Sequence, residues 1–393
     1  MSGAAVPVEA ASPEADRLNQ RAVALTSRGQ YEEAAALFIQ ALRLSPNDEV
    51  IRRNFSGLRT RWGHQLLRGG LLDQAQGQYQ AALDLNPNEM AAVLGLGDVQ
   101  LRRREPRMAA ETYRRAVRLD PGNADAYVRL GEAYYHQGDL TAALSEWERA
   151  LTLRPGNAEL RKRIQEVGNE ARVQGGYRAR ESQHFTVVYE GQRREDIGQE
   201  LLRILERAYA DVGYELGAYP PSEVQVVFYS DADFRDATGL PAALVGGGFY
   251  DLLDGKIRIA LKGLSPGDPW LRAALYHEYT HALIYAITRG NNAPRWVHEG
   301  LAVQMERQRA PEFKQEAIRR ARGGVVPTLE QSPYTQGSVA IGYLMDRYGM
   351  SGIQQLLRRM GEGRPFAQAF QETFRMDVAA LQQNLRDLLV RGN

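Results

Sequence analysis

The feature that most restricts the fold of this chain is a period of 34 residues in its first half. Three prolines mark the period, at Pro87, Pro121 and Pro155. Before each proline an aromatic residue lies between two alanines, and the copies are Ala75, Tyr79, Ala82; Ala109, Tyr113, Ala116; and Ala143, Trp147, Ala150. A fixed period of this length is typical of stacked helical repeats, because each repeat packs only against its neighbours.

An earlier copy of the pattern lies upstream, separated from the next copy by 41 rather than 34 residues, which indicates an extension of seven residues. Its residues are Gly29, Tyr31, Ala34, Phe38, Ala41 and Pro46. Small alanine and glycine residues allow two helices to approach closely, an aromatic ring fills the space between them, and proline ends the second helix. The pattern resembles the tetratricopeptide repeat, and the resemblance covers about residues 15–157.

This resemblance implies an all-α tetratricopeptide-repeat solenoid over residues 15–175, preceded by a flexible segment at residues 1–14. In this interpretation residues 158–174 form a polar helix that caps the solenoid. Arrays of this family usually present a concave groove to a peptide or a protein. We therefore expect a protein partner in the repeat groove, although the sequence does not identify that partner.

The pattern changes after Gly176 from helical to strand-like. Segments rich in β-branched residues predict strands at 184–189, 223–229 and 256–261. A helix is expected between the first two strands, at 194–214, and residues 246–254 predict a further strand and turn. The second domain, residues 180–393, is therefore expected to have an α+β fold with a small mixed sheet and a helical C-terminal half.

A long helix is predicted after this sheet. Aspartate is a common N-cap and proline suits the first helical position, so Asp268 and Pro269 indicate where the helix begins. Arg289 and Gly290 indicate where it ends.

The centre of this helix carries the pattern His-Glu-x-x-His, formed by His277, Glu278 and His281. Residues four apart lie one above the other on a helix, so both imidazoles can bind one metal ion. Glu278, on an adjacent face, can reach the water that the ion activates. Catalytic zinc needs a third protein ligand and keeps one position for water. Glu299 is the candidate, in a Trp-x-x-Glu-Gly-x-Ala segment that begins a second helix after Pro294.

These motifs resemble those of the gluzincin peptidases, both the thermolysin-like enzymes and the zinc aminopeptidases, and are closest to small bacterial peptidase domains of that clan. The resemblance covers about residues 180–393. It implies one zinc ion per chain, Glu278 as general base, and a tyrosine that stabilises the tetrahedral intermediate. By position that tyrosine is Tyr334, in a Tyr-x-x-Gly segment at a helix start. Tyr343 is its rival, but the apolar neighbours of Tyr343 favour core packing.

The expected activity is zinc-dependent hydrolysis of a peptide bond in a protein or peptide substrate, with the repeats recruiting the substrate or a partner. Zinc aminopeptidases carry a Gly-x-Met-Glu-Asn strand whose glutamate binds the free amine of the substrate. Residues 246–250 lie in the corresponding place without that glutamate, so we favour an endopeptidase. Two alternatives stay open: an aminopeptidase with another amine anchor, and a non-catalytic repeat scaffold with a metal-bound, peptidase-like domain.

Further expectations concern the surroundings of the metal. Glu306 follows Glu299 by seven residues, or two helical turns, so its carboxylate can accept the second ring N–H of a ligand histidine. His298 adjoins the third ligand but points about 100° away from it, so we expect no zinc bond and leave open a substrate contact. The strand at 256–261 would offer an exposed edge to an extended peptide. Its substrate-binding residues would be Lys256, Ile257, Arg258 and Ile259.

Composition excludes several other functions. The 49 basic and 48 acidic residues give no excess for neutralising phosphates, so nucleic acid is not an expected partner. Because the chain has no cysteine, imidazole and carboxylate must bind any transition metal. No apolar run approaches the ~20 residues of a membrane span, and the first residues lack the pattern of a secretion signal. We expect a soluble protein of the bacterial cytoplasm, or of the periplasm or exterior if a signal segment was removed.

Overall fold

The computed structural model describes residues 12–190, 195–241, 247–252, 254–261, 263, 265, 267–290, 293–306 and 310–391. Most of the expected flexible segment, residues 1–11, therefore lies outside the described residues. Contacts divide the chain into two compact units. The first unit contains the chain as far as Gln137 together with Ser145–Gly156, and the second contains Gly138–Leu144 and the chain from Asn157 onward.

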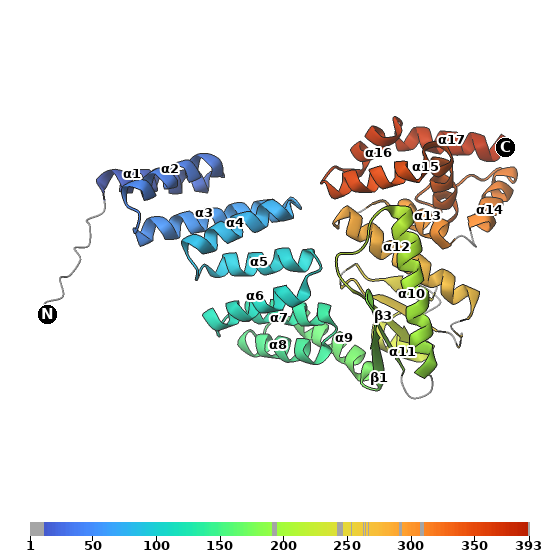
Figure 1. The fold of residues 1–393 in the computed structure, drawn as a ribbon, viewed down its shortest axis with the longest axis horizontal. Helices are drawn as coiled ribbons and strands as arrows, with labels where there is room; N and C mark the ends of the chain where they lie inside the picture. Colours follow the sequence, from blue (N-terminus) through green and yellow to red (C-terminus); the bar gives the residue numbers. More distant parts are fainter. Residues whose placement is uncertain are drawn as a thin grey trace. The chain divides into compact units, whose positions relative to one another are not determined.

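The first unit consists of helices that pack in consecutive pairs (Figure 1). The pairs are α1 (Pro13–Ser27) with α2 (Tyr31–Leu44), α3 (Glu49–Arg68) with α4 (Leu72–Leu85), α5 (Met90–Arg102) with α6 (Pro106–Leu119), and α7 (Ala124–Gln137) with α8 (Leu140–Leu153), whose first residues, up to Leu144, are counted with the second unit. The seven-residue extension lengthens α3, which has 20 residues where α5 has 13. The helical solenoid predicted from the period is thus confirmed in this half.

The aromatic position of each repeat is buried, as expected. Tyr79, Tyr113 and Trp147 are each 0% exposed. A Cβ atom on Gly95 would lie 2.4 Å from the ring of Tyr79, so a side chain at that position would displace the ring. The small residues of the repeat therefore set how closely α5 approaches α4.

The second unit is built on a five-stranded mixed sheet in the order β1-β2-β3-β5-β4. The strands β2, β3 and β5 run parallel, while β1 pairs antiparallel with β2 and β4 pairs antiparallel with β5. Their bounds are β1 (Tyr177–Glu181), β2 (Phe185–Glu190), β3 (Val224–Tyr229), β4 (Gly248–Tyr250) and β5 (Ile257–Ala260). The small mixed sheet predicted for this half is present.

Helices cover both faces of the sheet. Alternate strand residues such as Val187 and Val226 face the main core, which they share with α10, α12, α13 and α15. Val188 and Val227 face the other side, against α9 and α11. The helices of this unit are α9 (Ala158–Gln174), α10 (Glu195–Leu216), α11 (Asp231–Thr238), α12 (Pro269–Thr288), α13 (Arg295–Glu306), α14 (Ala310–Arg322), α15 (Thr335–Gly361), α16 (Phe366–Phe374) and α17 (Val378–Arg391).

The position of α9 differs from the expected one. We expected this helix to cap the repeats, but its contacts count it with the second unit. It packs against α11, and Val173 lies against the cluster that contains Val188 and Tyr229. The physical reason is that a helix carrying both polar residues and a few apolar ones is stabilised by the face that buries the apolar ones, and the sheet supplies that face.

The expected substrate edge at residues 256–261 is wrong. The strand β5 pairs with β3 on one side and with β4 on the other, so it is interior to the sheet. Lys256, Ile257, Arg258 and Ile259 are all buried. The segment before β5 folds back as a hairpin and occupies the edge where we expected the substrate. Among the described strands, β4 lies at this end of the sheet.

None of the described helices combines the length and the apolar character that crossing a membrane requires.

Candidate metal centre

The helix α12 begins and ends where the sequence predicts. The side chain of Asp268 accepts a hydrogen bond from the backbone N–H of Trp270 at 2.8 Å, and Pro269 occupies the first helical position. Arg289 ends the helix in the left-handed conformation, with φ of 53°. Most of α12 is buried, because α10, α13, α15 and β4 all contact it.

The three predicted ligand residues lie together. The Nε2 atom of His277 is 3.2 Å from Oε2 of Glu299, and Nε2 of His281 is 3.6 Å from the same oxygen. One possible ligand atom from each residue lies within 4.8 Å of the other two. Two imidazoles and one carboxylate are the donor set of many catalytic zinc sites, and three protein ligands leave a position for water. The residues present therefore fit a catalytic zinc ion.

Glu306 lies beside His277, as its spacing on α13 predicts. The Nδ1 atom of His277 is 2.5 Å from Oε1 of Glu306, and both residues are buried. A carboxylate that binds one ring nitrogen fixes the orientation of the imidazole and leaves the other nitrogen to face a metal. Here that other nitrogen, Nε2, faces Glu299.

Electrostatic effects within this cluster favour the charged forms of both the His277 imidazole and the Glu299 carboxylate. Burial lowers the pKa of His277, but the hydrogen bonds to Glu299 and Glu306 outweigh burial and raise the pKa to about 10. Burial raises the pKa of Glu299, yet the two histidines hold that pKa well below its usual range. The cluster thus keeps Glu299 ionised, which is the form that binds a metal.

Glu278 contacts the strand β4. Its side chain is buried, and the backbone N–H of Tyr250 on β4 donates a hydrogen bond to it. A Cβ atom on Gly248 would lie 3.6 Å from Cγ of Glu278, so β4 passes directly beside the carboxylate arm. Burial raises the pKa of Glu278 above its usual range.

Tyr334 lies at the start of α15, next to the predicted ligand residues. Its ring stacks against that of His277, with 6.0 Å between the ring centroids. Its hydroxyl hydrogen-bonds to Glu299, and burial together with the charge on Glu299 raises the pKa of Tyr334 to about 12. Tyr343 packs at the margin of the core, and its hydroxyl accepts a hydrogen bond from Arg347 at 3.0 Å. Of the two tyrosines, Tyr334 is therefore the one that lies beside the predicted ligand residues.

Two glycines explain why Tyr334 lies so close to Glu299. Our sequence interpretation gave these glycines no role. A Cβ atom on Gly300 would lie 2.3 Å from the carbonyl oxygen of Gly337, and one on Gly337 would lie 2.4 Å from that of Trp296. The backbones of α13 and α15 thus cross in direct contact. Both glycines belong to motifs noted in the sequence, one following Glu299 and one following Tyr334 by three residues.

Arg295 is a neighbour of the centre that sequence reasoning missed. Its Nε atom is 3.5 Å from Oε1 of Glu299, four residues later on the same helix, and its side chain also hydrogen-bonds to Tyr334. His298 lies on the other side, with its ring centroid 5.6 Å from that of His281. Burial, with a smaller effect of His281, lowers the pKa of His298 to about 3.

Comparison with known proteins identifies the first half of the chain. Residues 15–48, 60–123 and 98–158 match the sequence pattern of the tetratricopeptide repeat. A search of curated proteins finds no match to the chain.

Similar solved structures include the first TPR domain of human RPAP3, which is 23% identical, with 29% of this chain and 89% of that one covered and a TM-score of 0.28. MamA from Desulfovibrio magneticus RS-1 is 22% identical, with 40% and 86% covered and a TM-score of 0.33. YrrB, described as a TPR protein with an unusual peptide-binding site, is 22% identical, with 37% and 72% covered and a TM-score of 0.30. Because residues 15–48 and 60–158 match the sequence pattern of the family, these residues of the chain are tetratricopeptide repeats, as the period predicts.

Proposed function

We propose that the second unit is a zinc-dependent peptidase and that it hydrolyses internal peptide bonds. The observation that carries this proposal is the cluster of His277, His281 and Glu299, whose ligand atoms lie within 4.8 Å of one another. Glu278, the residue expected to act as a base, follows the first ligand directly. Because the described chain brings these residues together from two separate helices, the pattern in the sequence corresponds to one site.

Each residue of the site has a distinct role in this reaction. A bound zinc ion would polarise the scissile carbonyl and lower the pKa of the attacking water. Glu278 takes the proton of that water and passes it to the leaving amine, a task that suits a carboxylate whose pKa is raised by burial. Tyr334 donates its hydroxyl proton in a hydrogen bond to the oxygen on which negative charge develops. Its pKa, raised to about 12, keeps the hydroxyl protonated well above neutral pH.

The substrate would lie along β4. A strand at the end of a sheet presents backbone N–H and C=O groups to an extended peptide, which then adds as a further strand. The contacts of Gly248 and Tyr250 with Glu278 place this strand beside the base. The peptide backbone would therefore be held next to the groups that act on it.

The same strand bears on the choice between internal and terminal cleavage. The described residues of β4 are Gly248, Phe249 and Tyr250, and none of them carries a carboxylate that could bind a free amine. An endopeptidase does not need such a group, because it accepts a substrate that continues in both directions. Acetylation of the substrate's N-terminus should therefore leave cleavage largely intact.

The repeats would supply the choice of substrate. Tetratricopeptide repeats mediate contacts with proteins and peptides, so a partner bound in the groove would be tethered to the same chain as the zinc site. Tethering raises the effective concentration of a second segment of that partner without any new contact at the site. The repeats would then select the protein and the second unit would cleave it.

The substitution Glu278→Gln tests the proposal. The amide cannot accept the water's proton, so hydrolysis should fall by at least about 10²-fold while one zinc per chain is retained. The measurements are mass spectrometry of a peptide-library digest and metal analysis of the same preparation. A control digest with chelator should match the variant.

Three other outcomes would overturn the proposal or part of it. Undiminished hydrolysis by Glu278→Gln would remove Glu278 from the reaction. If the wild-type protein binds zinc and a partner but cleaves no peptide in the library, the non-catalytic scaffold is the better reading. Loss of cleavage after acetylation would favour an aminopeptidase.

A further inference from the structure

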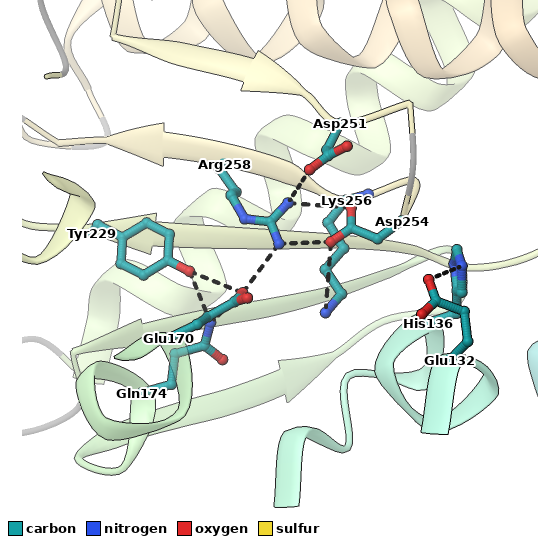
Figure 2. A network of polar contacts seen from close by, with 9 residues as sticks. All are labelled: Glu132, His136, Glu170, Gln174, Tyr229, Asp251, Asp254, Lys256 and Arg258. Carbon is teal, nitrogen blue, oxygen red and sulfur yellow. Dashed lines mark hydrogen bonds and ion pairs between the residues drawn. The ribbon is translucent and has the colours of Figure 1, made fainter. Parts of the chain in front are cut away.

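A second cluster of charged residues lies in the same unit, centred on Arg258 of β5 (Figure 2). The guanidinium Nη2 atom is 2.6 Å from Oδ2 of Asp254 and 3.1 Å from Oε1 of Glu170, while Nη1 is 3.3 Å from Oδ2 of Asp251. Lys256 Nζ is 4.0 Å from Asp254. Arg258 is only 3% exposed and Glu170 is likewise 3% exposed, so these charges lie out of water.

Stability alone does not account for such a cluster. Removing charges from water costs several kcal/mol for each ion, and apolar residues of similar volume often stabilise a fold equally well or better. A buried ion cluster does fix geometry, because a carboxylate that moves away leaves a buried charge without its partner. The groups that Arg258 fixes therefore indicate its role.

Those groups belong to the hairpin of β4 and β5 and to α9. Asp251 directly follows the last residue of β4, and Asp254 lies in the turn, where it also accepts a hydrogen bond from the backbone N–H of Lys256 at 2.9 Å. The guanidinium carbon is 6.0 Å from the centre of the Phe249 ring, on β4 itself. Arg258 thus contacts the strand, its exit and its turn.

The strand β4 needs such anchoring because it is short. It pairs with β5 over three residues, and no other described strand pairs with it. Yet its last residue, Tyr250, donates the backbone hydrogen bond that the Glu278 carboxylate receives. A shift of β4 along β5 would therefore remove a donor from the proposed base.

We propose that Arg258 is a positioning residue, which holds β4 in register and thereby holds the carboxylate of Glu278 in place. This inference rests on the proposed function of Glu278 as the base. It gives the cluster a role in catalysis that acts through the hairpin, since Arg258 binds Glu170, Asp254 and Asp251.

Arginine suits this role better than lysine would. Its planar guanidinium has five N–H donors in a fixed arrangement and can bind several carboxylates at once, whereas an ammonium group is a compact point charge. The substitution Arg258→Lys therefore keeps the charge and loses the geometry. The matched control is Arg178→Lys on β1, an exposed arginine at the opposite end of the sheet.

The test is amide hydrogen exchange of full-length protein, followed by kinetics. In Arg258→Lys we expect exchange in peptides that cover β4 to accelerate about tenfold or more, the effect of losing one charge-assisted hydrogen bond, while β2 and β3 exchange as in wild type. Zinc content should stay at one per chain. The value of kcat should fall about tenfold while KM changes little, and Arg178→Lys should match wild type in every respect.

Several results would overturn the proposal. Unchanged exchange at β4 would show that Arg258 does not hold the strand. Uniform acceleration across β2, β3 and β4 with a lower Tm would show a structural role only. If Arg258→Lys does not fold, Asp251→Asn is used instead, because Asp251 is partly exposed and the substitution removes only one of the ion pairs of Arg258. Unchanged exchange at β4 in this variant would also refute the proposal. Absence of hydrolysis in wild type refutes the proposed peptidase alone, since the exchange result does not depend on activity.

Discussion

In the proposed zinc site, His277 is the residue whose protonation would be most directly coupled to metal binding. Burial lowers its pKa, but Glu299 and Glu306 raise it to about 10, so the metal-free protein carries a proton on this imidazole at neutral pH. A zinc ion in the proposed site would bind the neutral ring and would have to displace that proton. Lower pH favours the protonated form, so zinc binding should weaken as pH falls. We expect the association constant to rise about tenfold per unit between about pH 7 and pH 9.

Calorimetric titration with zinc in two buffers of different ionisation enthalpy counts the protons released. We expect about one proton per zinc ion near neutral pH. The matched variant is Glu306→Gln, which removes one of the carboxylates that raise the pKa of His277; its affinity should drop about 10–100-fold and its pH dependence should flatten. A wild-type affinity that does not change over this pH range would contradict the assignment of His277.

At the residue scale, helical periodicity explains what the sequence could predict. A spacing of four brings His277 and His281 together, and a spacing of seven brings Glu306 to the same face as Glu299. Arg295 lies four residues before Glu299, so the same rule could have found it. The hydrogen bond from Tyr250 to Glu278 could not be found in this way, because it depends on how a strand packs against a helix.

At the element scale, the crossing of α13 and α15 decides where Tyr334 lies. A methyl group on Gly337 would stand 2.4 Å from the carbonyl oxygen of Trp296, so Gly337→Ala must push the two helices apart. Overpacking of this kind typically costs about 1–3 kcal/mol of stability. Because Tyr334 begins α15 and the proposed ligand Glu299 lies on α13, separation of the helices also moves the hydroxyl away from the proposed site. We expect kcat to fall about 10²-fold or more.

The comparison that checks this expectation uses Tyr334→Phe, which removes the hydroxyl and leaves the crossing intact. If the hydroxyl acts on charge that appears only in the transition state, this variant should lose about 10²–10³-fold in kcat with little change in KM. Thermal unfolding should be nearly unchanged for Tyr334→Phe and lowered for Gly337→Ala. Full activity of Gly337→Ala would show that the contact does not position the tyrosine.

The strands show where prediction from sequence ends. Segments rich in β-branched residues predicted β2, β3 and β5, because interior strands must be apolar on both faces. The same pattern does not give strand order, so β5 was expected at the edge and is interior. We did not predict β1, because its sequence, YRARE, is charged and suits a strand at the end of a sheet. We also did not predict the helix α11, although Ser230 is a recognisable N-cap at its start.

At the scale of the whole molecule, the boundary of the second unit decides which fragment folds. The expected boundary near residue 180 omits α9, and with it Glu170, a buried partner of Arg258. A fragment comprising residues 138–393 keeps every segment that the contacts assign to the second unit. A fragment comprising residues 177–393 leaves part of a buried ion cluster without its counter-charge, which costs about 3 kcal/mol or more.

Chemical unfolding and metal analysis of the two fragments test this expectation. The longer fragment should unfold in one cooperative transition and bind one zinc ion. The shorter one should be less stable, and it should expose the apolar surface that α9 covers next to Val188 and Tyr229. Equal stability would place the boundary after α9. On short unstructured peptides the longer fragment should match the full chain in kcat/KM, while cleavage of a protein partner should need the repeats.

The edge strand β4 has a consequence for what such an enzyme could recognise. Pairing with the backbone of an edge strand requires a peptide that is extended and whose own amide groups are free. It depends little on the sequence of that peptide. In a folded helix or sheet the amide groups already form hydrogen bonds, so such segments cannot pair with β4. Cleavage by the second unit would then depend on whether a protein bound to the repeats is folded. The same partner would resist cleavage when folded and would be cleaved when one of its segments unfolds.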